Sequence, residues 1–320
     1  MDNNLNIEQE NKVYNFTKIK KLKCGANPQQ GACLYHYDRE LDFEILQGNS
    51  LTYNNIIDST VALETVAEFF DVPALCVSNS SNISAVALGV DVENAWDKII
   101  DSDAQCYNRC TIASSREINL ELAKKLSPLP IKVILAPLFS AEALKELSKN
   151  KGVKLVKINT KLEEILKYTP EEIKLTPFGA LIQEKDTKDL DVETFKVATK
   201  KKPEQKEVED MIFAFKVAKH VKSMGIVVAK DLRTLGVVNG ETNRARATEF
   251  AIAKVCDSPK DAVVASDGFF TTIDNIQIMA QNRISGVIQP MGSIADKEII
   301  DVCDKLNIAM ISTGIRHIKY

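Results

Sequence analysis

Apolar positions along this chain follow two spacings that alternate from end to end. Short continuous runs, such as Ala74–Val77 and Ile131–Ala136, are separated by segments in which apolar residues return every three or four positions. Continuous runs are typical of buried strands, and the longer spacing is typical of amphipathic helices. Strands that alternate with helices in this way predict an α/β fold.

The strand-loop-helix order occurs twice, which predicts two similarly built halves. We expect a disordered N-terminus over residues 1–12, a first half over 13–198 and a second half over 199–320, with Thr199–Glu207 as the connection. The clearest helix follows that connection, because one face carries apolar residues throughout: Val208, Met211, Ile212, Phe215, Ala218 and Val221.

The segment from Val263 to Tyr320 contains the most distinctive strand-loop-helix-strand unit. Ser293 and Asp296 have the spacing of a helix capping box, which predicts that Gly292-Ser293 feeds a helix N-terminus. Free N–H groups at such a terminus suit a phosphate or a carboxylate. Arg316, beyond the second strand, can hold a phosphate with two hydrogen bonds. An ordinary turn with a surface arginine explains the same residues.

Two further loops are candidates for chemistry. The polar loop Ser78–Asn82 follows a buried strand, and ligands of open α/β sheets gather at the carboxyl ends of strands. Leu22–Gln30 combines glycine, asparagine and proline, which forces a turn. This second loop is either a binding loop or a tight corner.

Composition excludes several classes of protein. The 320 residues are 45% hydrophobic and 27% charged, as in ordinary globular proteins, and the net charge of -3 argues against a nucleic-acid binder. No apolar run approaches the ~20 residues of a membrane span. Seven cysteines without a signal peptide indicate reduced thiols, so we expect a cytoplasmic protein.

Metal and dinucleotide chemistry find little support. Cys106 and Cys110 lie four positions apart, but no second pair or histidine falls at a zinc spacing, so we expect no metal. Neither G-x-G-x-x-G nor a Walker A pattern occurs. Of the three histidines, we expect His220 on a helix surface. His317, beside Arg316, is the better candidate for catalysis, and a structural histidine is the alternative there.

Several motifs together resemble the transformylase domain of the bifunctional purine enzymes that make inosine monophosphate. The resemblance runs from about Leu22 to Tyr320 and keeps the order of the motifs. Segments of this chain are similar to the family's L-R-Y-G-x-N-P-H-Q, Y-N-N-x-x-D, F-A-W-K-V-A-K-x-V-K-S and S-D-A-F-F, namely Leu22–Gln30, Tyr53–Asp58, Phe213–Ser223 and Ser266–Phe270. The resemblance implies a cytidine-deaminase-like α/β/α sandwich and a homodimer with active sites across the interface.

The resemblance also implies ligands. The family's domain transfers a formyl group from 10-formyltetrahydrofolate to aminoimidazole carboxamide ribonucleotide (AICAR), without a metal. Its pattern implies Asp274 and Asn275 for the folate, and for the nucleotide Lys23, Gly25, Arg244, Phe269 and Arg316. The cyclohydrolase domain of the family does not precede this chain's transformylase motifs, so we expect a separate IMP cyclohydrolase as a possible partner.

The departures from the family pattern concern catalysis. The family's catalytic lysine and histidine fall on Asn79 and Ser80, and only Asn82 of that motif remains. Neither asparagine nor serine is a base near neutral pH. Polar family positions also fall on Leu138 and Met224. Two interpretations remain: a divergent formyltransferase that uses another base, or a non-catalytic relative that binds a nucleotide, folate or partner subunit.

Overall fold

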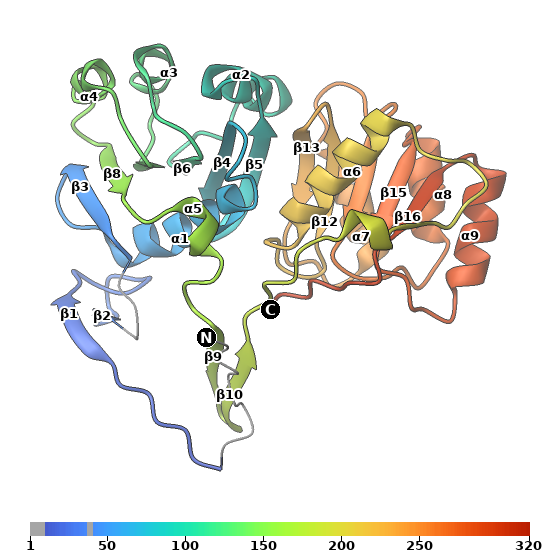
Figure 1. The fold of residues 1–320 in the computed structure, drawn as a ribbon, viewed down its shortest axis with the longest axis horizontal. Coiled ribbons are helices and arrows are strands. Elements are labelled where there is room, and N and C mark those ends of the chain that lie inside the picture. The colour runs from blue at the N-terminus through green and yellow to red at the C-terminus, as the bar shows by residue number, and fades with distance from the viewer. Residues whose placement is uncertain (1–9, 37–40) are drawn as a thin grey trace.

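Twelve strands form one continuous mixed sheet in the computed structural model, which describes residues 10–36 and 41–320. The strand order is β11-β16-β15-β14-β12-β13-β5-β4-β6-β7-β8-β3. Figure 1 shows the halves side by side, the first in blue to green and the second in yellow to red. The predicted α/β class is confirmed as a mixed α/β protein built on this large sheet.

The first half forms one side of the sheet. Strands β6, β7 and β8 are parallel, and β4 and β3 flank them in the antiparallel direction. Its elements are β3 (Phe43–Gln47), α1 (Tyr53–Ala67), β4 (Ala74–Asn79), β5 (Asn82–Leu88), α2 (Val92–Ser102), β6 (Thr111–Ser114), α3 (Leu120–Leu126), β7 (Val133–Ala136), α4 (Ala141–Leu147), β8 (Lys154–Ile158) and α5 (Leu162–Ile165).

The second half repeats this order. Strands β14, β15 and β16 are parallel, and β12 and β11 flank them in the antiparallel direction. Its elements are β11 (Lys196–Val197), α6 (Gln205–Ala218), β12 (Ile226–Lys230), β13 (Arg233–Val238), α7 (Arg244–Ala253), β14 (Val263–Ser266), α8 (Asp274–Gln281), β15 (Gly286–Gln289), α9 (Asp296–Lys305) and β16 (Ala309–Ser312). The helix predicted after the connection is confirmed as α6.

Each half contains a hairpin with the same tight turn. Ser80 and Ser81 join β4 to β5 with φ angles of 52° and 57°, and Asp231 and Leu232 join β12 to β13 with 56° and 57°. Positive φ at both central residues defines the turn whose twist matches a two-residue hairpin. The segment Ser78–Asn82, predicted as a loop, is therefore mostly strand, because only its two central serines leave the ladder.

An aspartate supports each of these turns. Asp58 lies five residues after the start of α1, and its carboxylate accepts a hydrogen bond of 2.6 Å from the backbone N–H of Ser81. Asp210 lies five residues after the start of α6 and accepts bonds of 3.0 and 2.7 Å from the N–H groups of Asp231 and Leu232. The two halves thus share a detail of side-chain chemistry as well as strand order.

One hydrophobic core extends under both halves. Val66 and Phe69 of the first half belong to the same buried cluster as Phe213 and Phe215 of α6. The Phe69 and Phe213 rings lie 5.5 Å apart. The sheet itself is continuous through β5 and β13, so burial and strand pairing both hold the halves together.

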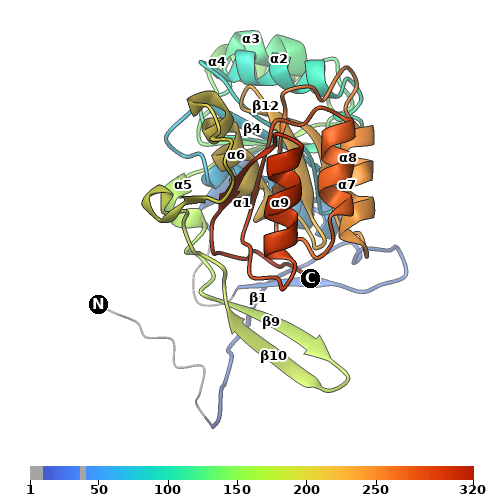
Figure 2. The same cartoon turned by 90° about the vertical axis from the view of Figure 1, so that its right-hand side faces the viewer.

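Two ribbons lie outside the main sheet. β1 (Thr17–Lys21) pairs with β2 (Cys33–His36), and β9 (Glu171–Thr176) pairs with β10 (Gly179–Glu184). Figures 1 and 2 show that the β9–β10 ribbon projects away from the helices and the large sheet. A short 3-10 helix, η1 (Val192–Thr194), then leads into the second half.

The predicted disordered N-terminus lies mostly outside the described residues, which begin at residue 10. Within that segment, the Lys12 ammonium forms an ion pair with Glu171 at the start of β9. The boundary predicted at 198/199 falls between β11 and α6. β11 pairs with β16, so the sheet of the second half already includes the two residues of β11.

Candidate functional site

The Ser80–Ser81 turn lies at the amino ends of the parallel strands of its own half. β4 pairs with β6 in the antiparallel direction, with Ser78 opposite Thr111. The turn follows the carboxyl end of β4, as expected, but not the carboxyl ends of the parallel strands β6, β7 and β8. The rule applies to parallel neighbours, and β4 belongs to a hairpin.

The turn instead shares a sheet edge with the carboxyl ends of the second half's strands. From β4 through β5, β13 and β12 to β14, every neighbouring pair is antiparallel. Four reversals restore the original direction, so β4 and β14 end at the same edge. The loops after β14, β15 and β16 carry Phe269, Gly292-Ser293 and Arg316, which the sequence also selected.

A direct contact joins the two parts of this edge. Lys222, in the segment before β12, donates a hydrogen bond of 2.8 Å from Nζ to the Ser81 hydroxyl. The Lys222 carbonyl accepts a 2.9 Å bond from the N–H of Gly240, which fixes the backbone from which this side chain extends. The structure therefore brings the predicted turn and the second half's loops into one candidate site.

The polar side chains of the turn mainly bond to one another. Asn82 Nδ2 donates to the Ser80 carbonyl at 3.0 Å, and the Ser80 hydroxyl donates to Asn79 Oδ1 at 3.3 Å. Asn79 Nδ2 donates to the carbonyl of Asn108 at 3.3 Å. These groups hold a turn and offer hydrogen bonds, but an amide and a hydroxyl do not titrate near neutral pH.

Arg244 is engaged inside the protein. Its Nη1 donates to the Ser266 hydroxyl at 2.8 Å and forms an ion pair with the fully buried carboxylate of Asp267. The Ser223 hydroxyl donates to the same carboxylate. Because a buried carboxylate requires a partner, this arginine fastens α7 to the end of β14, and its role in substrate binding stays a prediction.

Arg316 is the exposed cation of the edge. Its guanidinium carbon lies 4.3 Å from the centroid of the Phe269 ring, a cation–π contact, while Phe270 is fully buried in the core. Among the described residues, the Arg316 guanidinium has no hydrogen-bond partner. It therefore presents an unused fork of donors above a flat aromatic surface, which suits an anionic ligand.

The Gly292-Ser293 turn differs from its prediction. The N–H groups of Gly292 and Ser293 donate to Asp296 Oδ2 at 2.7 and 3.1 Å, and the Ser293 hydroxyl accepts from the N–H of Ala295. The expectation of free N–H groups for a ligand is wrong, because the first residue of α9 supplies a carboxylate from within the chain. Arg316 is left as the exposed cation beside this loop.

The predicted loop around Lys23 and Gly25 lies on the N-terminus of α1. The Gly25 N–H donates to the Gln30 carbonyl at 2.7 Å, which closes the loop. Asn54 Nδ2 donates to the carbonyl of Ala26 at 3.2 Å and fastens the loop to the helix. The first turns of the same helix supply Asp58 to the Ser81 turn, so this loop and that turn lie at the same end of the first half. Lys23 is exposed there.

The two residues predicted for the folate differ in accessibility. Asp274 begins α8 and is exposed, so its carboxylate is available to a ligand. Asn275 is buried, accepts a 3.0 Å bond from the Thr248 hydroxyl and donates to the Thr272 carbonyl at 3.3 Å. The Asn275 side chain thus connects α8 to α7.

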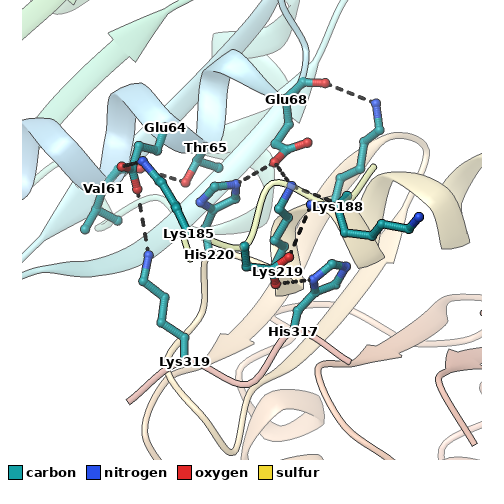
Figure 3. Close-up of polar contacts among 12 residues, drawn as sticks. Val61, Glu64, Thr65, Glu68, Lys185, Lys188, Lys219, His220, His317 and Lys319 are labelled. Atoms are coloured by element: carbon teal, nitrogen blue, oxygen red, sulfur yellow. Dashed lines mark hydrogen bonds and ion pairs between the residues drawn. The ribbon is translucent and has the colours of Figure 1, made fainter. Parts of the chain in front are cut away.

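Two histidines are buried between the halves and are engaged there. His220 Nε2 lies 2.9 Å from Glu68 Oε1 (Figure 3), and His317 Nδ1 lies 2.6 Å from Asp186 Oδ2. The expectation of a surface position for His220 is wrong. α6 ends at Ala218, and the chain then turns inward, so helical periodicity no longer describes this residue.

The ionic cluster around Glu68 was missed by sequence reasoning. Lys219 Nζ lies 2.9 Å from Glu68 Oε1, and both side chains are 5% exposed. Burial acts to raise the pKa of Glu68, but the His220 hydrogen bond and the two basic partners outweigh it and lower that pKa to about 2. Burial lowers the pKa of His220, and its Nε2–H donates to the ionised Glu68 carboxylate. Nothing local in the sequence pairs these distant residues.

A cavity of about 420 Å³ lies at the seam between the halves, beside the candidate edge. It is lined by both seam strands, including Asn82 of β5 and Asn239, and Asn239 Nδ2 bridges the seam to the Ile83 carbonyl at 3.1 Å. Within residues 10–36 and 41–320, no three acidic, histidine or cysteine side chains are grouped as a metal site. The helices of the same part are too short or too polar to cross a membrane.

The fold and the edge define an α/β protein of two halves with the same order of elements, and residues of both halves form the candidate site. Residues 2–254 match the family model described as AICARFT/IMPCHase bienzyme. The chain belongs to this family, as its motifs suggested.

Nearly the whole length of this chain is similar to proteins named bifunctional purine biosynthesis protein PurH. The identity is 39% over 309 residues for Caldicellulosiruptor saccharolyticus, 37% over 313 for Acetivibrio thermocellus and 35% over 316 for Anoxybacillus flavithermus. These alignments cover 94%, 95% and 97% of this chain but 59%, 60% and 61% of the relatives. The chain thus spans about three fifths of the length of these curated relatives.

Proposed function

We propose that this chain is a cytoplasmic, cytidine-deaminase-like member of its family that binds AICAR at the sheet edge shared by its two halves. The rate at which it transfers a formyl group from 10-formyltetrahydrofolate is far below that of an ordinary enzyme. The contact between Lys222 and Ser81 carries the proposal, because it assembles one site from residues of both halves. Purine biosynthesis is the process to which the names of the curated relatives belong.

The binding part of the proposal rests on Arg316 and Phe269. AICAR carries a phosphate and a flat heterocycle, and the edge presents an exposed guanidinium above an aromatic ring. Lys23 lies exposed at the same end of the first half, on the N-terminus of α1. A phosphate between such cations gains charge-assisted hydrogen bonds, which are about twice as strong as neutral ones.

The weak catalysis follows from Asn79 and Ser80. Formyl transfer to an aromatic amine requires removal of a proton, and a positioned base contributes roughly 10² to 10⁴ in rate. The amide and hydroxyl at this turn cannot take that proton. His220 and His317 are buried in contacts with Glu68 and Asp186, so neither ring replaces the missing base.

The assembly part of the proposal rests on the β9–β10 ribbon. Its register places Ile173, Leu175 and Ile182 on one face, and Phe178 at the tip is fully exposed at 101%. A lone two-stranded ribbon is marginally stable in water, and exposed apolar clusters mark interaction surfaces. We infer a homodimer in which this ribbon packs against the second copy.

Lys222 favours a second candidate, a working formyltransferase. Its amine lies 2.8 Å from the Ser81 hydroxyl, next to the position of the family's catalytic pair, and lysine serves as a general base where its surroundings deprotonate it. Under this candidate, Lys222→Met abolishes turnover while AICAR still binds.

Calorimetric titration with AICAR and, separately, with 10-formyltetrahydrofolate tests the proposal, together with a turnover assay. The expected result is AICAR binding with turnover at least a hundredfold below the median enzyme rate of roughly 10 s⁻¹. Turnover near that median would establish the second candidate. Binding of neither compound would refute the nucleotide site and leave a partner-subunit role.

A further inference from the structure

Asp186 connects the base of the projecting ribbon to the C-terminal segment. It follows β10 by two residues, and its Oδ2 lies 2.6 Å from Nδ1 of His317. An ionised carboxylate only accepts hydrogen bonds, so Nδ1 of His317 carries the proton. Burial acts to raise the pKa of Asp186, but the His317 bond outweighs it and holds that pKa below its ordinary value.

His317 is held on three sides. Its side chain is 1% exposed, and its ring lies 5.1 Å from that of Phe215 in α6. The backbone N–H of His317 donates to the Asp267 carbonyl at 3.0 Å. The preceding residue is Arg316, whose guanidinium lies over Phe269. The orientation of His317 therefore sets the backbone from which Arg316 reaches the candidate site.

Among the described residues, no hydrogen bond holds the Arg316 side chain. Its position depends on the Phe269 ring and on the backbone at residues 316 and 317. The backbone is anchored on the far side by Lys319, whose carbonyl accepts from the Ser223 N–H at 2.8 Å. Asp186 is thus the only side chain that the described structure shows fastening the His317 ring through a hydrogen bond.

We propose that Asp186 is a positioning residue for Arg316, acting through His317, and that it links the ribbon to the anion-binding edge. The ligand part of this inference rests on the proposed function, since Arg316 is there the group that holds the phosphate. The link runs from β10 through the Asp186–His317 pair to Arg316, without any contact between Asp186 and a ligand.

The surroundings of the pair support a fixed ribbon base. Lys185, the residue before Asp186, pairs with Glu64 of α1 at 2.6 Å, and Lys319 lies 3.8 Å from the same carboxylate (Figure 3). Lys219 Nζ donates to the Lys188 carbonyl at 3.3 Å. The base of the ribbon is thereby bonded to α1, to the end of α6 and to the C-terminal segment.

Asp186→Ala in the full chain, with Asp189→Ala as the matched control, tests the inference. Asp189 is an exposed carboxylate of the same loop, so its loss changes net charge equally. In ¹⁵N-arginine-labelled protein, the Arg316 Nε–H signal, assigned by its loss in Arg316→Lys, reports the position over the Phe269 ring without any ligand. Calorimetry with AICAR supplies the second readout.

The expected result is a shift of the Arg316 signal toward its unfolded position in Asp186→Ala but not in Asp189→Ala. AICAR affinity should fall about 3- to 30-fold, the range for residues that act on a site through a neighbour. Asp186→Glu should restore both readouts in part. An unchanged Arg316 signal in Asp186→Ala overturns the inference. If the parent binds AICAR, a shifted signal with unchanged AICAR affinity in Asp186→Ala overturns it as well. A parent that binds no AICAR refutes the proposed function, and the signal alone then decides.

Discussion

Asp58 and Asp210 make the same contact in the two halves of the molecule. Each lies five residues after the start of its helix and supports a two-residue turn through its carboxylate. Asp58 accepts one backbone N–H bond, from Ser81, and Asp210 accepts two, from Asp231 and Leu232. The Asp58 turn belongs to the candidate site, whereas the Asp210 turn lies at the opposite edge of the sheet. The fold therefore repeats a structural device in two places but combines it with the candidate ligand groups in one.

Replacement of these aspartates should destabilise the protein unequally. We expect Asp58→Ala, which loses one charged hydrogen bond, to lower the free energy of unfolding by about 1.5–3 kcal/mol. Asp210→Ala should lower the free energy of unfolding further, because it leaves two backbone N–H groups without their acceptor. Urea unfolding measures both, with exposed Asp71→Ala as the control. Equal losses in all three variants would contradict the assignment.

Glu68→Ala should be among the most destabilising single changes. It leaves the Lys219 ammonium, 5% exposed, buried without its carboxylate, which costs about 3–5 kcal/mol. The double variant Glu68→Met with Lys219→Met removes both charges and should recover most of that loss. Calorimetric unfolding distinguishes these outcomes. A double variant as unstable as the single one would show that volume and not charge decides.

Stability should decline on the acid side in two steps. Burial lowers the pKa of His220 below its ordinary 6.5, so below that pH the unfolded chain takes up a proton that the folded one refuses. Glu68 has a folded pKa of about 2 against 4.5, so its contribution is complete above pH 4.5 and is lost as the pH falls toward 2. Urea midpoints from pH 8 to 3 measure the decline. His220→Gln should remove the first step and reduce the second, because His220 also helps to lower the pKa of Glu68.

Arg316→Ala should weaken AICAR binding by about 1.5–3 kcal/mol, the range for a hydrogen bond to a charged group. Arg316→Lys should recover part of this loss, since it keeps the charge but not the planar fork. Calorimetric titration provides the affinities, and exposed Arg283→Ala serves as the control. If Arg316→Ala binds AICAR as tightly as the parent, the phosphate lies elsewhere.

Phe178→Asp should disrupt the proposed dimer. A charge at the tip of the β9–β10 ribbon would be desolvated in an interface but not in a free chain. Light scattering at micromolar concentration should show two copies of the 35.5 kDa chain for the parent and one for the variant. Lys174→Ser, on the opposite face of the ribbon, should leave the mass unchanged. A monomeric parent would refute the proposed homodimer and, with it, any active site across its interface.

Much of the fold follows from local patterns. The buried strands near Ala74, Ile131 and Val263 and the helix α6 were predictable, because apolar runs and helical spacing act over a few residues. The family was predictable from multi-residue motifs, and so was the selection of Arg316 and Phe269. The hairpin turn at Ser80 was missed, although two small polar residues between strands are a signal for it.

Tertiary structure decided which of these residues meet. Lys222 and Ser81 are 141 positions apart, and they touch only because four antiparallel pairings bring two halves to one edge. The Gly292-Ser293 turn has lost its free N–H groups to Asp296, and His220 has turned inward to Glu68. Local sequence encodes whether a segment is strand or helix, because propensity and burial act along the chain. Contacts between side chains depend on strand direction and on which groups are already bonded, and only the folded chain sets both.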